Sequence, residues 1–174
     1  MIHNHSSLVL VFLLFVASSY AIPVEKEKEI CKQTKNPSFC FSLLNSQPNA
    51  DLAGLIQFTI KTTRANVTNT INLTKTLIAK SASDPNATKH YKSCLDHFND
   101  ALDNVDYTLE LFKKGDYGGV GVAMSAVGTD VDDCLSGESP SDPPYNDPSQ
   151  LPQYGAVVEL LAIITIIISK SLFH

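Results

Sequence analysis

Four cysteines restrict the possible folds of this 174-residue chain more than any other feature, because their chemistry depends on where the protein is delivered. Residues 8–17 form a short apolar run, LVLVFLLFVA, and the SSYA that follows places small residues three and one positions before Ile22. This is the pattern of a secretory signal peptide with a cleavage site. We therefore expect residues 1–21 to be removed and residues 22–174 to form one domain with a hydrophobic core.

Outside the cell, in an oxidising environment, four cysteines most simply form two disulfides. Cys94 lies 21 residues before Gly115, and Cys134 lies 19 residues after it. If Gly115 marks the turn of an antiparallel helical hairpin, a rise of about 1.5 Å per residue brings these two cysteines level with each other. The spacing predicts a Cys94–Cys134 disulfide and leaves Cys31–Cys40 to close a small loop, ICKQTKNPSFC.

Apolar side chains recur at steps of three and four residues through most of the mature chain, which is typical of helices that bury one face. The pattern runs through residues 52–78, most clearly through 91–112, and again through 120–135. Asp84 and Asp116 stand between these segments, where N-cap residues are expected. The buried stripe predicted for the second segment consists of Tyr91, Cys94, Leu95, Phe98, Leu102, Val105, Leu109 and Phe112.

A proline- and serine-rich connection, residues 136–153, leads to a last apolar segment near the C-terminus. We expect a fourth helix here, with isoleucines 163, 166 and 167 on the flanks of its buried stripe. That stripe would consist of Tyr154, Val157, Val158, Leu161, Ile164, Ile168 and Leu172.

The same segment has an alternative interpretation, because a Ser/Pro-rich spacer before an apolar tail is also typical of a lipid-anchor signal. The protein would then be a lipid-anchored interaction protein at the cell surface. However, the unbroken apolar core at 156–168 is shorter than the roughly 20 residues that span a membrane. It also contains Glu159, which is costly to place in lipid. We therefore favour a bundle helix over membrane anchoring.

Together these segments predict an all-α fold with two disulfides. An N-terminal helical hairpin would occupy residues 22–47, and an antiparallel four-helix bundle would occupy residues 49–174.

Composition and motifs exclude several functions. A net charge of −5 does not provide the basic face that nucleic acids require. His90, Cys94 and His97 have a spacing that suits a metal, but the predicted disulfide uses Cys94, so we expect no metal site. The sequence contains neither a G-x-S-x-G nucleophile motif nor a phosphate loop. It therefore predicts a protein that binds a partner, without a cofactor and without enzymatic activity of its own.

Three tripeptides match the Asn-x-Ser/Thr acceptor sequence for N-linked glycans, beginning at Asn66, Asn72 and Asn86. A similar tripeptide at residues 36–38 is excluded by its central proline. All three matching asparagines are candidate glycosylation sites in a secreted chain.

Four segments carry a further signal when they are taken in order: EICKQTKNPSFCFSLL, DLAGLIQFTI, HYKSCLDHFNDALDNVDYTLELFKKGDY and AMSAVGTDVDDCLSG. With this cysteine spacing they resemble the N-terminal hairpin and the first three bundle helices of the plant invertase and pectin methylesterase inhibitors. The resemblance implies the same fold, the same first-to-second and third-to-fourth disulfide pairing, and export to the apoplast or cell wall. It also implies an inhibitor that covers the active-site cleft of its target enzyme.

The resemblance leaves two targets open. Invertase inhibitors often carry Pro-Lys-Phe directly after the turn, where this chain has Tyr117, Gly118 and Gly119, and this favours pectin methylesterase. Acid invertase of the cell wall or vacuole is the alternative. Asp133, before the fourth cysteine, also departs from the Thr that is often found in the methylesterase inhibitors.

We expect the target to contact polar residues of the second and third bundle helices that lie off the apolar stripe. These candidates are Asp96, Asn99, Asp103, Tyr107, Thr129 and Asp130. Because the chain is acidic, its association with a basic enzyme should weaken as salt screens the charges.

Overall fold

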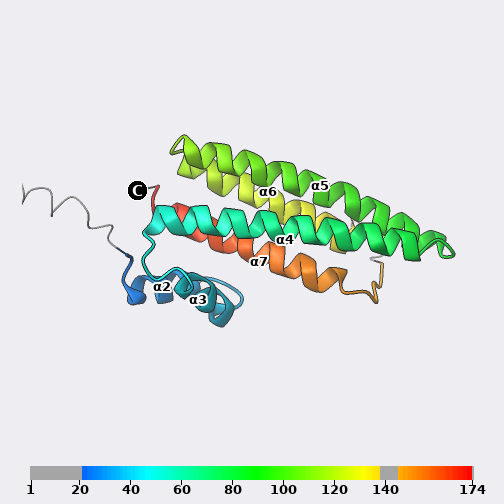
Figure 1. Cartoon of the computed structure of the whole chain (residues 1–174), viewed down its shortest axis with the longest axis horizontal. Coiled ribbons are helices and arrows are strands. Elements are labelled where there is room, and N and C mark those ends of the chain that lie inside the picture. Colours follow the sequence, from blue (N-terminus) through cyan, green and yellow to red (C-terminus); the bar gives the residue numbers. More distant parts are fainter. Residues whose placement is uncertain (1–20, 138–144, 174) are drawn as a thin grey trace, which may run out of the picture.

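The computed structural model describes residues 21–137 and 145–173, and these residues form helices and loops without strands. The expected signal peptide falls almost wholly outside the described residues. The helices are α2 (Val24–Cys31), α3 (Pro37–Asn45), α4 (Leu52–Lys80), α5 (Pro85–Lys113), α6 (Tyr117–Ser136) and α7 (Leu151–Lys170) (Figure 1). The all-α prediction is confirmed.

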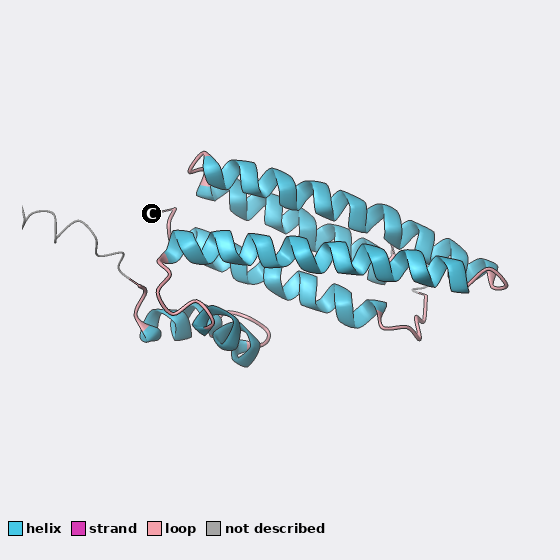
Figure 2. Ribbon diagram, viewed as in Figure 1, coloured by secondary structure: helices cyan, strands magenta, loops and turns pink. Residues whose placement is uncertain are grey.

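The last four helices form the antiparallel bundle. α5 packs mainly against α4 and α6, and α7 packs mainly against the same two helices, so α4 and α6 lie diagonally across the bundle. The short helices α2 and α3 form a separate hairpin, which contacts α7 near the end of the bundle where α4 begins (Figures 1 and 2).

The predicted helix starts are confirmed by side-chain caps. The Asp84 carboxylate accepts hydrogen bonds from the backbone N–H groups of Asn86 and Ala87, at 3.0 and 3.1 Å. Asp116 accepts one from Gly119 at 2.8 Å. Gly115 between α5 and α6 has a φ of 73°, a conformation that favours glycine.

Both disulfides have the pairing that the spacing predicted. Cys31 and Cys40 join the two hairpin helices with their Cα atoms 5.4 Å apart. Cys94 and Cys134 join α5 to α6 with a Cα distance of 4.5 Å. The second bond closes the open end of the α5–α6 pair.

The buried face of α5 differs in part from the prediction. Tyr91, Cys94, Phe98 and Val105 are buried, as expected. The remaining predicted positions are only half-buried: Leu95, Leu102, Leu109 and Phe112. Other side chains of α5 take part of their place in the core. The added buried positions are Ala101, Thr108 and Leu111.

Three positions on α7 also correct the prediction, and one of them, Val157, is only half-buried. Tyr154 is 40% exposed, and the neighbouring Gly155 is buried instead. A Cβ at Gly155 would lie 3.0 Å from Leu135, so the glycine allows α7 to approach α6 closely. Ile167, expected on a flank, is buried, whereas Ile163 and Ile166 are half-buried.

In length and composition α7 could cross a membrane, and it is the one such helix among the described residues. However, half of its most apolar window is buried inside the bundle. Core helices of water-soluble bundles pass the same test, so the packing agrees with a bundle helix.

Candidate functional site

The expected contact residues lie on the outer surface of α5 and α6, which we call the α5–α6 face. Its residues are Asp96, Asn99, Asp103, Tyr107, Thr129 and Asp130. The four on α5 recur at steps of three and four residues and are all exposed. Tyr107 exposes 53% of its surface. An exposed aromatic residue among carboxylates suits a protein partner.

The α6 residues of this face differ in accessibility. Thr129 is exposed, but Asp130 is only half-buried at the contact between α5 and α6. The Asn104 amide donates a hydrogen bond to Asp130 at 2.8 Å. Burial raises the pKa of Asp130 above its ordinary value, and this hydrogen bond acts against the shift. Asp130 therefore also stabilises the packing of α5 on α6.

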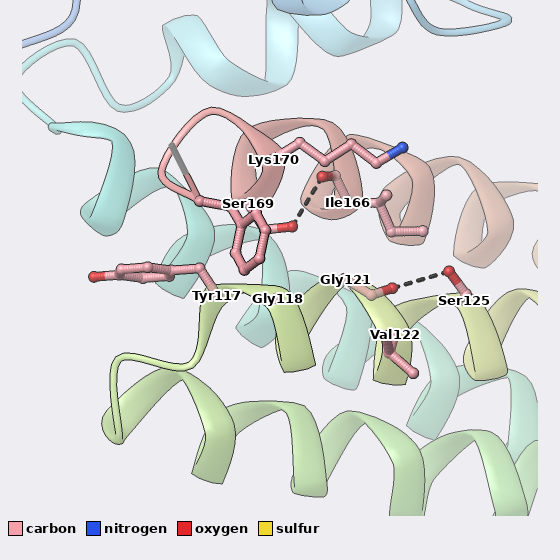
Figure 3. Close-up of a pocket in the computed structure, with 9 residues that line it drawn as sticks. Tyr117, Gly118, Gly121, Val122, Ser125, Ile166, Ser169 and Lys170 are labelled. Atoms are coloured by element: carbon pink, nitrogen blue, oxygen red, sulfur yellow. Dashed lines mark hydrogen bonds between the residues drawn. The ribbon is translucent and has the colours of Figure 1, made fainter.

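A groove between α6 and α7 lies beside this face (Figure 3). It consists of two adjoining hollows of about 460 and 360 Å³, which share Ser125 and Ile166. Val122, at its edge, is 73% exposed. In Figure 3, Tyr117 lies at one end of the groove, and Lys170 extends along α7 at its border.

Sequence reasoning did not find this groove. The available signal was the series of small residues on α6, Gly118, Gly121, Ser125 and Gly128, which leaves space beside α7. Which neighbour faces the small residues depends on how α6 is rotated in the bundle.

A buried polar cluster, which we call the connection clasp, ties the long connection to the start of α5. The Tyr91 hydroxyl donates a hydrogen bond to Asp147 at 2.8 Å, and so does the Ser149 backbone N–H. His90 stacks on Tyr145 with ring centroids 4.5 Å apart. The second carboxylate oxygen of Asp147 lies 3.5 Å from His90 Nε2, and the Asp147 side chain is only 4% exposed.

Two side chains of the connection clasp, His90 and Tyr91, have shifted pKa values. Burial lowers the pKa of His90 below its ordinary value, although the Asp147 carboxylate acts in the opposite direction. Burial and the hydrogen bond to Asp147 raise the pKa of Tyr91 to about 12. The clasp lies beside the Cys94–Cys134 disulfide, because the Cys94 sulfur is 3.7 Å from His90 Nε2. It therefore holds the connection at the same end of the bundle as the disulfide.

No group of three metal-ligating side chains comes together within residues 21–137 and 145–173. Of the three residues with metal-like spacing, Cys94 is in its disulfide and His90 is in the clasp. The described residues present an acidic face with an exposed tyrosine, next to a groove between α6 and α7.

Comparisons with known proteins agree with this description. A family model described as "Plant invertase/pectin methylesterase inhibitor" matches residues 27–161. The chain is 35% identical over 127 residues to Pectinesterase inhibitor 1 of Arabidopsis thaliana, covering 72% of each protein. It is 32% identical over 173 residues to the Pectinesterase inhibitor of Actinidia deliciosa, covering 95% of this chain and 91% of the relative.

Solved structures give the same result. A mutant form of a pectin methylesterase inhibitor from Arabidopsis superposes with a TM-score of 0.71 at 28% identity, covering 81% of this chain and 93% of the other. A second pectin methylesterase inhibitor, from Arabidopsis thaliana, superposes with a TM-score of 0.65 at 27% identity, covering 88% and 99%. By its sequence, its disulfide pairing and its helical architecture, the chain belongs to the plant invertase/pectin methylesterase inhibitor family.

Proposed function

We propose that this protein is a secreted inhibitor of pectin methylesterase and is not itself an enzyme. The observation that carries the target is the name shared by its curated relatives, which are pectinesterase inhibitors. The family also includes invertase inhibitors, so acid invertase is the enzyme to test beside it.

Inhibition would occur by occlusion, with the α5–α6 face covering the cleft that binds pectin. Demethylated pectin is a polyanion, so a cleft that holds it benefits from basic side chains. Asp96 and Asp103 on the exposed side of α5 offer carboxylates to such a surface. Tyr107 adds a large, partly apolar contact of the kind that is enriched at protein interfaces.

The direct test mixes the purified mature chain with plant pectin methylesterase and with acid invertase. We expect loss of the esterase activity at micromolar inhibitor and no effect on invertase. Activity of both enzymes at that concentration would contradict the proposal, and loss of invertase activity alone would reassign the target.

Charge reversal tests the contact face. Asp103→Lys should reduce inhibition at least tenfold, because it places like charges in the contact. Glu25→Lys makes the same change in net charge on the exposed side of α2 and should leave inhibition unchanged. The association rate of the wild-type protein should fall as salt increases. Equal losses in the two variants would exclude the α5–α6 face as the contact.

Secretion and the boundaries of the mature chain can be measured by intact mass. We expect the chain to begin at Ile22 and to end at His174, with α7 retained as part of the domain. A secreted form that ends between residues 136 and 141 and carries a lipid would instead support the anchor interpretation.

A further inference from the structure

The three glycan-acceptor tripeptides differ in how exposed their asparagine side chains are. Asn72 on α4 and Asn86 in the first turn of α5 are exposed. Asn66 is half-buried on α4, and its Nδ2 donates a hydrogen bond to the backbone carbonyl of Thr62 at 2.8 Å. Nδ2 is the atom to which an N-linked glycan is attached, so at Asn66 this atom is directed at the helix backbone.

We propose that Asn72 and Asn86 carry N-linked glycans, that Asn66 does not, and that the two glycans lie outside the surface that binds the target. The assignment of the glycans depends only on the fold and on secretion. The statement about the target rests on the proposed function.

The attachment of an N-linked glycan forms one bond and breaks another. The amide Nδ2 of asparagine forms a bond with the anomeric carbon of an oligosaccharide, which the secretory pathway supplies as a lipid pyrophosphate. The bond between that carbon and the pyrophosphate oxygen breaks, the lipid pyrophosphate leaves, and one amide proton passes to a base of the transferase. The product is a bulky, hydrophilic group that must reach solvent from the folded protein.

The third residues of the tripeptides indicate when the transfer takes place. Thr74 is buried, and its hydroxyl donates to the Thr70 carbonyl at 2.8 Å. The Thr88 hydroxyl donates to the Ser81 carbonyl at 2.7 Å. Because both hydroxyls are engaged in the folded chain, the transfer must precede folding. The finished fold then has to accommodate the glycan, which favours exposed asparagines.

The two exposed sites lie away from the α5–α6 face. α4 packs against α5 and α7 and lies diagonally opposite α6, so an exposed residue on α4 such as Asn72 faces away from α6. Asn86 is ten residues before Asp96, which is about 15 Å along the helix. The start of α5, which includes this residue, lies at the end of the bundle away from the hairpin (Figure 1). Neither attachment site belongs to the α5–α6 face, and we expect an enzyme seated on that face to leave both glycans outside the contact.

The sites are tested by secreting the full chain from plant cells and mapping peptides before and after treatment with peptide N-glycosidase. We expect glycans on Asn72 and Asn86 and an unmodified Asn66. A glycan on Asn66, or the absence of a glycan from Asn72 or Asn86, would overturn the assignment. This outcome does not depend on whether the protein inhibits any enzyme.

The placement is tested by moving a glycan to the α4 side of α5, at the edge of the α5–α6 face. Asp106→Asn creates an acceptor tripeptide with Tyr107 and Thr108, next to the exposed tyrosine. The change is made together with Asn72→Gln and Asn86→Gln, so that a lectin retains only chains glycosylated at the new site. Asp106→Gln is the matched control, because it also breaks the ion pair with Arg64 but adds no glycan.

We expect the glycosylated Asp106→Asn protein to lose at least tenfold in inhibition of pectin methylesterase. The Asp106→Gln control and the Asn72→Gln, Asn86→Gln double variant should inhibit like the wild type. A tenfold loss in that double variant would overturn the placement of the native glycans. Full inhibition by the chain glycosylated at the new site would exclude a target contact around Tyr107 and would leave the assignment of Asn72 and Asn86 intact.

Discussion

The N-terminal hairpin and the four-helix bundle achieve stability by different means. The hairpin helices have eight and nine residues and bury little besides Ile30, Leu44 and the Cys31–Cys40 disulfide. The bundle helices have 20 to 29 residues and share a continuous core, so their disulfide adds to packing that already exists. A segment as short as the hairpin cannot bury enough apolar surface to fold alone. Its covalent bond therefore replaces part of a hydrophobic core.

The two regions also bury titratable groups of opposite character. Glu27 in the hairpin is only 4% exposed, and its Oε2 has no hydrogen-bond partner. His90 in the bundle is buried beside the Asp147 carboxylate. A buried carboxyl group favours acid conditions, and a buried imidazole favours neutral ones. We therefore expect the two regions to respond to pH in opposite directions.

The largest expected effect comes from removing the disulfides in pairs. The chain-entropy estimate gives about 4 kcal/mol for the 40-residue separation of Cys94 and Cys134, against about 2.6 kcal/mol for the nine-residue separation of Cys31 and Cys40. Urea unfolding of the two double Cys→Ser variants measures the difference. We expect the bundle to lose more stability. Equal losses, or a larger loss from the hairpin pair, would contradict the chain-entropy ranking and would show that the hairpin depends more on its covalent bond.

The next effect is acid destabilisation of the bundle through the connection clasp. Burial lowers the folded pKa of His90, so its contribution to stability is complete above the unfolded value of about 6.5. It is lost as the pH falls below that value, because the unfolded chain takes up the proton more readily. We expect the midpoint temperature of thermal unfolding to decrease as the pH is lowered from 7 to 5. The decrease should be smaller in His90→Phe, which keeps a ring on Tyr145. Identical pH profiles would exclude His90 as the cause.

The hairpin should respond in the opposite sense. Burial raises the folded pKa of Glu27, so its contribution to stability is complete below the unfolded value of 4.5 and is lost as the pH rises through the folded pKa. Glu27→Gln should increase hydrogen-exchange protection of α2 at pH 7 and should have no effect in acid. Glu25→Gln, at an exposed position on the same helix, is the control. Reduced protection in Glu27→Gln at pH 7 would show that the carboxylate is paired in solution.

The smallest effect concerns the ion pair that links the two regions. Lys35 Nζ lies 2.9 Å from Glu159 of α7, and the lysine side chain is 78% exposed, so solvent screens the pair. Lys35→Gln should leave the unfolding midpoint of the bundle unchanged and should slightly reduce exchange protection of the hairpin at low salt. Lys32→Gln, nearby in the hairpin, serves as the comparison. A clear loss of bundle stability in Lys35→Gln would show that the two regions unfold together.

Features that depend on short stretches of the chain were predictable from the sequence. Helix starts follow from Asp84 and Asp116, because a cap acts on backbone groups only two or three residues away. The disulfide pairing followed from the distances to Gly115, because an antiparallel pair of helices converts sequence separation into height along the bundle. The exposure of Asp103 and Tyr107 followed in the same way from helical periodicity.

Only the tertiary structure decided which polar side chains are buried. Four threonines of α4, Thr59, Thr63, Thr70 and Thr74, are buried in the core. Their hydroxyls donate to carbonyls three or four residues earlier in the same helix, which removes most of the cost of burying them. Tyr91 and Asp147 of the clasp are 56 residues apart, and no local pattern joins them. Helical periodicity determines which face of a helix is apolar, but the burial of a particular hydroxyl or carboxylate depends on the neighbouring helix that covers it.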